Sequence, residues 1–149
     1  MDDLHERAGS CDVIHLHGEL NRPRCFACAR IYDGANPEAI DDFGTPQEPP
    51  RCIKCGGKVR PGVVWFGESL PKDELRKTYQ TAKECDLWIS IGTSGVVFPA
   101  AEMPRIARRN GAQVVNINLN PTGESHDICL QGLAGEFLSR FLASAFAVF

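Results

Sequence analysis

Residues 85–94 read Cys-Asp-Leu-Trp-Ile-Ser-Ile-Gly-Thr-Ser. The apolar run predicts a buried strand over residues 85–91 that stops at Gly92. Helix formers with apolar positions at helical spacing occupy residues 71–84 before this strand and residues 99–110 after it. A second apolar run predicts a strand over residues 113–118. Strands and helices that alternate in this way form parallel α/β sheets, whose ligands bind at the carboxyl ends of the strands.

The flanking segments are less regular. A short strand is predicted over residues 13–20, before the turn residues 21–23, and another over residues 63–66. A polar loop continues to about residue 127, and a last helix is expected from about residue 134 to about residue 147. Prolines and glycines interrupt the segment between Cys25 and Cys55, so this segment is expected to be an irregular module inserted into the α/β fold.

Two Cys-x-x-Cys pairs lie inside this module. They are Cys25 with Cys28 and Cys52 with Cys55. Two such pairs complete a tetrahedral four-thiolate shell for zinc, and a closed shell of protein ligands makes the ion structural. Four buried thiols, or a redox-active pair, are the weaker alternatives. Of the other cysteines, Cys85 is expected to be a small buried hydrophobic residue, whereas Cys11 and Cys129 have no predicted role.

Composition restricts the class of protein. The chain has 149 residues, 43% of them hydrophobic, seven cysteines and a net charge of −3. These values are typical of one soluble domain, and the negative net charge provides no broad positive potential that would attract nucleic acid. No apolar run is long enough to cross a bilayer, and the acidic N-terminus differs from a signal peptide. Paired cysteines without a secretion signal favour metal binding in a reducing compartment, so we expect a cytoplasmic protein.

The order of the motifs resembles the sirtuins, which are NAD-dependent protein lysine deacylases. The motifs are His15-Leu16-His17-Gly18-Glu19-Leu20, the doubled cysteine pairs, Arg60-Pro61-Gly62-Val63-Val64-Trp65-Phe66-Gly67-Glu68, Gly92-Thr93-Ser94 and Asn118-Leu119-Asn120. Taken together, these motifs extend the resemblance from residue 2 to about residue 142. The sequences of residues 3–9 and 63–68 are most similar to those of the bacterial and mitochondrial class of sirtuins that is associated with acidic acyl groups such as succinyl.

The resemblance implies that His17 is the catalytic base. In the family's chemistry, the acyl oxygen of the modified lysine attacks the ribose of NAD and expels nicotinamide. The histidine then deprotonates a ribose hydroxyl that closes on the resulting imidate, and an imidazole is suited to accepting that proton near neutral pH. His5, His15 and His126 are expected to be solvated or structural.

The resemblance also implies the binding residues for both substrates. Residues Val63, Val64, Trp65, Phe66 and Gly67 correspond to the strand that pairs with the acylated peptide. Trp65 and Phe66 are expected to wall the lysine tunnel, although core packing explains Phe66 almost as well. The implied NAD contacts are Gly92, Thr93, Ser94, Asn118, Leu119, Asn120, Ala134 and, on the nicotinamide side, Asp2.

One departure from the family is large. The Gly-Ala-Gly-Ile-Ser phosphate loop, the first strand of the sheet and the residues that read an acidic acyl group have no counterpart in residues 1–149. We therefore expect the C-terminal part of a sirtuin, with an unpaired neighbour position beside both residues 87–91 and residues 114–118. Such a chain is expected to aggregate, to bind NAD weakly and to lack turnover. Acyl preference and protein targets stay undecided.

The predicted fold is α/β, a partial Rossmann-like parallel sheet with an inserted four-cysteine zinc-binding module. Residues 1–21 form the catalytic-loop segment, residues 22–60 the zinc-binding module and residues 61–149 the C-terminal half of the NAD-binding domain. The predicted function is NAD-dependent protein lysine deacylation, of the deacetylase or desuccinylase type, which transfers the acyl group to ADP-ribose. We expect acyl-lysine proteins or peptides as partners, no membrane or nucleic-acid partner, and a monomer if the chain is complete.

Two other classes of function remain open at this stage. One is a non-enzymatic zinc-ribbon module that binds protein through arginines such as Arg22, Arg24, Arg30 and Arg51. The other is an unrelated α/β nucleotide-binding enzyme in which Gly92-Thr93-Ser94 contacts phosphate.

Overall fold

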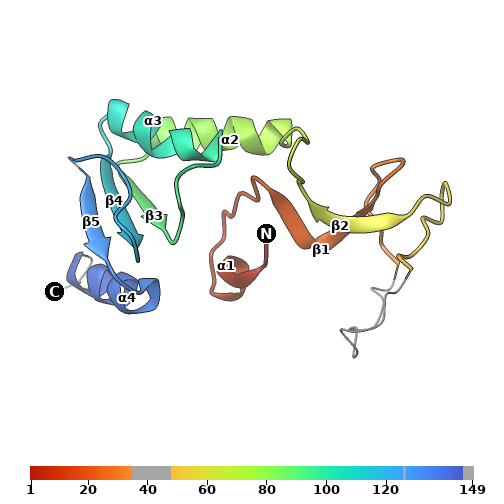
Figure 1. Ribbon diagram of the computed structural model, residues 1–149, viewed down its shortest axis with the longest axis horizontal. Helices are drawn as coiled ribbons and strands as arrows, with labels where there is room; N and C mark the ends of the chain where they lie inside the picture. Colours follow the sequence, from red (N-terminus) through yellow and green to blue (C-terminus); the bar gives the residue numbers. More distant parts are fainter. Residues whose placement is uncertain (35–47, 126, 146–149) are drawn as a thin grey trace. The chain divides into compact units, whose positions relative to one another are not determined.

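The computed structural model describes residues 1–34, 48–125 and 127–145. The chain divides into two compact units, Met1–Leu75 and Arg76–Phe149. The elements, labelled in Figure 1, are α1 (Leu4–Arg7), β1 (Gly18–Cys25), β2 (Val59–Val63), α2 (Lys72–Glu84), β3 (Leu87–Ile91), the 3₁₀ helix η1 (Ala100–Glu102), α3 (Met103–Arg109), β4 (Gln113–Asn118), β5 (Ile128–Gln131) and α4 (Ala134–Ala145).

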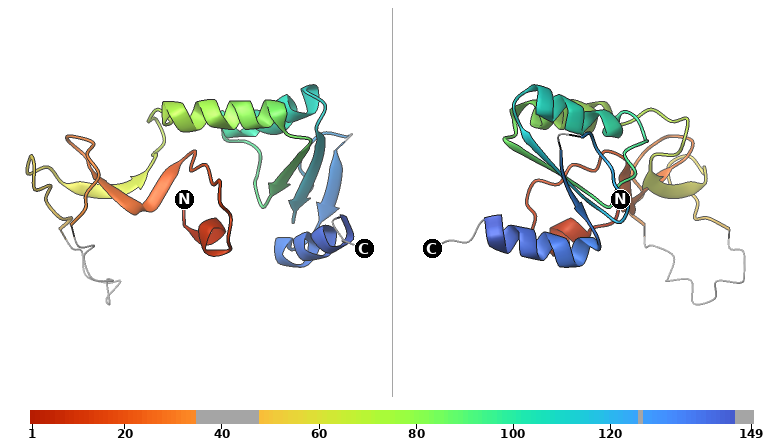
Figure 2. Two further views of the ribbon diagram at one scale, coloured as in Figure 1. Left: turned by 180° about the vertical axis from the view of Figure 1, so that it is seen from behind. Right: turned by 60° about the vertical axis from the view of Figure 1, so that its left-hand side comes forward.

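The second unit is built on a parallel sheet in the order β3-β4-β5. Its central strand, β4, buries Val114, Val115 and Ile117, and Met103 and Ala107 of α3 are buried as well. Figures 1 and 2 show α3 and α4 separated by this sheet. The predicted α/β class is therefore confirmed, because a strand that is apolar on both faces needs helices on both sides.

Strand β5 was not expected, since the loop prediction continued to residue 127 and assigned no strand after it. β5 has four residues and is mostly exposed, so its apolar pattern is weak. Because β4 pairs with β3 on one side and β5 on the other, the expected unpaired position beside residues 114–118 is wrong. Among the described residues β3 pairs along one edge only.

The predicted helices are confirmed with shifted ends. α2 begins at Lys72 and buries Ala82. The helix expected over residues 99–110 begins as a 3₁₀ turn and becomes α-helical at Met103. α4 begins at Ala134 as expected, and the last two residues of the predicted helix, 146 and 147, lie outside the described part of the chain.

The first unit contains an antiparallel pair, β1 with β2, instead of the strands expected over residues 13–20 and 63–66. β1 begins at Gly18 and continues through the predicted turn 21–23 to Cys25, with an irregularity in register between Glu19 and Arg24. β2 ends at Val63, where the second strand was expected to start. Both predictions are wrong because a two-stranded sheet has free edges, which tolerate prolines that are typical of turns elsewhere.

Close backbone approach explains the glycines of this strand pair. Gly18 has a φ of +75°, and a Cβ there would lie 2.1 Å from the Gly62 carbonyl oxygen. A Cβ on Gly62 would lie 2.0 Å from the carbonyl oxygen of Arg22. Neither position has room for a side chain, so the strand pair depends on both glycines.

The segment around the cysteines is irregular, as expected. Isolated bridges join Arg24 to Ile31 and Arg51 to Lys58. Its small core consists of Cys25, Cys52 and Val59, with Cys28 and Tyr32 packed against it. Within the described ranges, no helix is both long and apolar enough to span a membrane.

Candidate functional site

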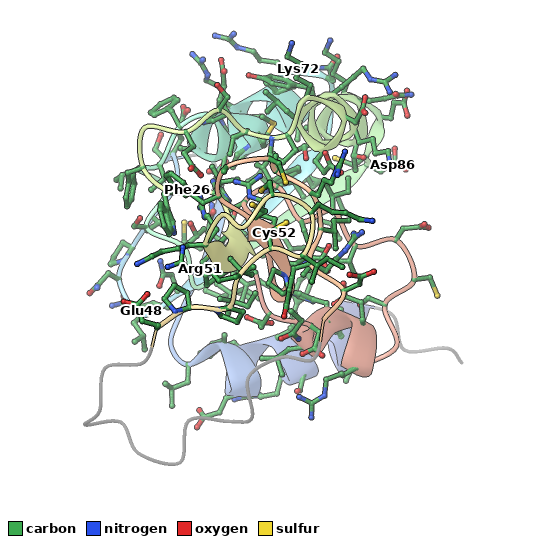
Figure 3. The ribbon with its side chains drawn as sticks, turned by 90° about the vertical axis from the view of Figure 1, so that its right-hand side faces the viewer. Phe26, Glu48, Arg51, Cys52, Lys72 and Asp86 are labelled. Atoms are coloured by element: carbon green, nitrogen blue, oxygen red, sulfur yellow. The ribbon has the colours of Figure 1, made fainter. Side chains whose placement is uncertain are left out.

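The four predicted zinc ligands converge. The sulfur atoms of Cys25, Cys28, Cys52 and Cys55 all lie within 4.8 Å of one another. The Sγ atoms of Cys25 and Cys55 are 3.4 Å apart, and those of Cys28 and Cys52 are 3.8 Å apart. Four thiolates on one zinc, each about 2.3 Å from the metal in a tetrahedron, would be about 3.8 Å apart. The cluster therefore has close to the dimensions of a four-thiolate zinc site. Phe26 and Cys52, labelled in Figure 3, belong to the two segments that supply the ligands.

Backbone N–H groups stabilise thiolates in this cluster. The N–H of Cys28 donates to Sγ of Cys25 at 3.5 Å and is the main cause that lowers the pKa of Cys25 to about 6. The Gly57 N–H lowers the pKa of Cys55, but the neighbouring thiols of Cys25, Cys28 and Cys52, together with burial, outweigh this effect and raise the pKa to about 12. Four crowded thiolates repel one another, so full ionisation of the cluster needs a cation at its centre.

Gly57 allows this crowding, because a Cβ there would lie 3.0 Å from Sγ of Cys25 and 2.8 Å from the methyl group of Ala27. Gly56 turns the chain with a φ of +71°. Together the two glycines let the backbone turn closely around the sulfur atoms, where its N–H groups can stabilise the thiolates.

His17 is the residue immediately before β1. Its carbonyl oxygen accepts a hydrogen bond of 2.9 Å from the Val64 N–H, so the main chain at the predicted catalytic base is joined to the predicted substrate segment. The residue is half-buried. His15 is different, because its Nε2 contacts a carboxylate oxygen of Glu6 in α1. This contact gives His15 a structural role in holding α1.

The substrate segment leaves the sheet at Val63 and turns at residues 65–68, where the Glu68 N–H donates to the Trp65 carbonyl at 3.0 Å. Gly67 has a φ of +86° in this turn. Trp65 is 47% exposed and Phe66 is 97% exposed. Within the described part of the chain Phe66 packs into no core, so core packing, the alternative to a binding role, is wrong there.

The predicted NAD contacts gather at the carboxyl ends of β3 and β4. Gly92 follows β3 with a φ of +61°, and its N–H donates to the Ile117 carbonyl at 3.0 Å. The Asn118 side chain donates to the Thr93 carbonyl at 2.7 Å and accepts from the Leu119 N–H at 2.9 Å. Asn118 thus fastens the two strand-end loops to each other. Ser94 and Asn120 are exposed beside them.

A shallow hollow lies next to these loops. It is lined by Asn116, Asn118, Asn120, Pro121, Thr122, Cys129, Leu130 and Gln131. Ala134, the last predicted NAD contact, is the first residue of α4 and is half-buried. Asp2 lies in the other unit, where its carboxylate accepts a hydrogen bond of 3.1 Å from the Leu4 N–H and has a lowered pKa for that reason. Asp2 therefore belongs to the first unit, together with His17, and the other predicted NAD contacts belong to the second unit.

Two partly buried ion pairs are not predicted by the sequence pattern. In the second unit, Arg108 of α3 donates to Asp127, whose side chain is 1% exposed and which also accepts from Asn116 and the Glu124 N–H. In the first unit, Arg60 pairs with Glu68. Arg60 and Glu68 flank the apolar run 63–66, where charged residues usually face water, so the sequence pattern does not indicate that they pair.

Residues 1–99 match the Sir2 family. The NAD-dependent protein deacylase 1 of Pseudomonas aeruginosa is 54% identical over 98% of this chain, which covers 60% of that protein. A crystal structure of a Sir2 homologue–NAD complex superimposes with a TM-score of 0.84 at 40% identity, covering 97% of this chain and 55% of the other. A Sir2 protein bound to a propionylated peptide gives 0.80 at 34% identity, covering 98% and 61%. The chain thus spans little more than half the length of the proteins it matches.

Proposed function

Because the chain belongs to the Sir2 family, we propose that it forms part of an NAD-dependent protein lysine deacylase. In this activity NAD supplies an electrophilic ribose carbon and nicotinamide as its leaving group, and the acyl group of a modified lysine ends on ADP-ribose. The observation that carries the proposal is the hydrogen bond from the Val64 N–H to the His17 carbonyl. It holds a candidate base beside a candidate peptide-binding segment.

In the proposal His17 is the general base that removes a proton from a ribose hydroxyl. Gly18, with no side chain and a φ of +75°, sets the direction in which the chain leaves His17. Val63 of β2 is the antiparallel partner of Gly18 and holds the backbone next to His17 from the second strand. A base held in this way by two strands loses little conformational freedom when a substrate arrives, which favours catalysis.

Residues Val63, Val64, Trp65, Phe66 and Gly67 form the proposed peptide site. The segment carries backbone donors and acceptors past the end of β2, where a peptide strand can be added. Strand addition selects the acyl-lysine side chain with little demand on the rest of the sequence. Trp65 and Phe66 are neighbouring large apolar side chains that are exposed at the surface. Adjacent exposed apolar residues mark binding sites more often than single ones do, which supports this role.

Gly92, Thr93, Ser94, Asn118, Leu119, Asn120, Ala134 and Asp2 are the proposed contacts to NAD. The position of the first six at the carboxyl ends of parallel strands supports the assignment. The four cysteines are the proposed ligands of one structural zinc ion. The division into residues 1–21, 22–60 and 61–149, a monomeric state and a cytoplasmic location belong to the same proposal.

The test measures nicotinamide release from NAD. The chain is completed with the part of the Pseudomonas aeruginosa deacylase that lies outside the match and is incubated with an acetylated, a succinylated or an unmodified lysine peptide. We expect release that depends on an acyl group. Release without an acylated peptide would favour a different NAD-consuming activity, and no release with any of the three peptides would contradict the proposal.

A further inference from the structure

Arg60 lies beneath the proposed peptide site. Its side chain is only 7% exposed, although it carries a permanent charge. One Nη atom contacts a carboxylate oxygen of Glu68, and the other donates to the Val63 carbonyl at 2.7 Å and to Glu68 at 3.1 Å. Val63 is the first residue of the proposed peptide site, and Glu68 directly follows its last residue, Gly67. One guanidinium therefore joins both ends.

The flat face of the same guanidinium supports the middle of the segment. Its carbon lies 3.5 Å from the centroid of the Trp65 ring. Glu68 completes the arrangement, since its carboxylate also accepts from the Trp65 N–H at 2.9 Å. The Arg60 guanidinium, followed by the Trp65 N–H, holds the pKa of Glu68 at about 2, so this carboxylate is charged throughout the physiological range.

The cluster extends to the cysteine module through Phe26. The Phe26 ring lies 6.1 Å from Trp65, and the Arg60 guanidinium lies 5.9 Å from the Phe26 ring. Phe26 directly follows Cys25, and its N–H donates to the Lys58 carbonyl at 2.9 Å. The cysteine module thus places the Phe26 ring against both Arg60 and Trp65.

We infer that Arg60 is a positioning residue, which fixes the shape of residues 63–68 so that this segment and its partly exposed Trp65 ring are ready to receive a peptide. The inference rests on the proposed function. Arginine is required because its fork bonds two acceptors while its face stacks on a ring. Lysine offers one compact charge and cannot do both. Preformed shape lowers the cost of binding, so Arg60 acts on peptide affinity rather than on the chemical step.

The first measurement uses the 149-residue chain with zinc. Trp88→Phe leaves Trp65 as the fluorophore. In this background Arg60→Lys should shift the Trp65 emission to longer wavelength and increase its quenching by acrylamide, because the ring loses its cover. Arg22→Lys is the matched control, since Arg22 lies in β1 and forms an exposed ion pair with Glu19 of that strand. Zinc content near one per chain in both variants shows that the module is folded.

An unchanged Trp65 emission in zinc-loaded Arg60→Lys would overturn the inference, whatever the enzymatic activity is. If Arg60→Lys loses zinc, Glu68→Gln takes its place, because it keeps the size of the side chain and removes the charge that holds Arg60. The same loss of Trp65 cover is then expected, and its absence would overturn the inference equally.

The second measurement uses the completed chain. Arg60→Lys should raise KM for the acylated peptide by about tenfold or more and change kcat by less than about threefold. Arg22→Lys should leave both unchanged. A fall in kcat at constant KM would contradict positioning of the peptide. If the chain with Arg60 intact shows no deacylation, the proposed function fails, while the Trp65 measurement still decides whether Arg60 shapes the segment.

Discussion

Gly18 and Gly62 bring two backbones closer together than any side chain allows. The chain then passes from His17 into β1 with its carbonyl turned toward the Val64 N–H. At this scale the cysteine ligands could be predicted, because their spacing alone encodes a tetrahedral site. The Arg60–Glu68 pair could not, because charged residues at the ends of an apolar run usually face water.

Gly18→Ala should destabilise the first unit by at least about 2 kcal/mol, since a methyl group meets the Gly62 carbonyl in a left-handed conformation. Thermal unfolding monitored by Trp65 in a Trp88→Phe background measures the effect. Gly9→Ala in the same unit, where φ is +97° but a Cβ meets no atom within 4 Å, is the matched control and should cost less stability than Gly18→Ala. Equal melting temperatures for the Gly18 variant and its parent would disprove the close-approach argument.

Helix α3 and strands β4 and β5 are joined by a buried network around Asp127. Burial by itself raises the pKa of Asp127, but the Glu124 N–H and the Arg108 guanidinium lower it below the ordinary value of 3.8. An aspartate with a lowered pKa stabilises the fold above its ordinary pKa and loses that contribution as the pH falls below it. The second unit should therefore weaken below about pH 4.

Asp127→Asn should lower the free energy of unfolding of the second unit by about 2 kcal/mol or more at pH 7 and by less at pH 3. Urea unfolding followed by Trp88, in a Trp65→Phe background, reports on this unit. Glu84→Gln serves as the control, because the exposed Glu84 carboxylate accepts a hydrogen bond from the exposed Gln80 on the same helix face. A pH-independent effect of Asp127→Asn would show that its charge is unimportant.

Elements differ in how well the sequence predicts them. Strand β4 was predicted with its exact bounds because it is apolar on both faces, and α2 because its apolar residues repeat at helical spacing. β1 and β2 were misplaced because they form a two-stranded sheet, whose free edges accept Pro23 and Pro61 and whose faces show no clear alternation. β5 depends on pairing with β4 rather than on its own pattern.

On the scale of the whole molecule, the chain consists of two compact units with separate sources of stability. The first unit has a small core of cysteines and Val59, whereas the second buries a strand between helices. A small core needs a metal or another cross-link to stay folded. The first unit is therefore expected to depend on zinc and the second is not.

Zinc removal should unfold the cysteine module and leave the parallel sheet intact. Hydrogen exchange of the 149-residue chain, with and without a strong chelator, should show lost protection in β1 and β2 and unchanged protection in β4. Cys25→Ser should reproduce the effect of the chelator, and Cys11→Ser, at an exposed cysteine outside the cluster, should not. Less than half an equivalent of zinc in freshly purified protein would refute the metal assignment.

The most direct test of the proposed deacylase is product analysis with His17 replaced. In the completed chain, mass spectrometry should detect nicotinamide and O-acyl-ADP-ribose in equal amounts, and His17→Ala should reduce the deacylation rate at least ~100-fold. His15→Ala, which breaks the contact with Glu6, should have a mild effect. More than about a tenth of the activity in His17→Ala would contradict the account, because a general base contributes at least about 100-fold to such a reaction.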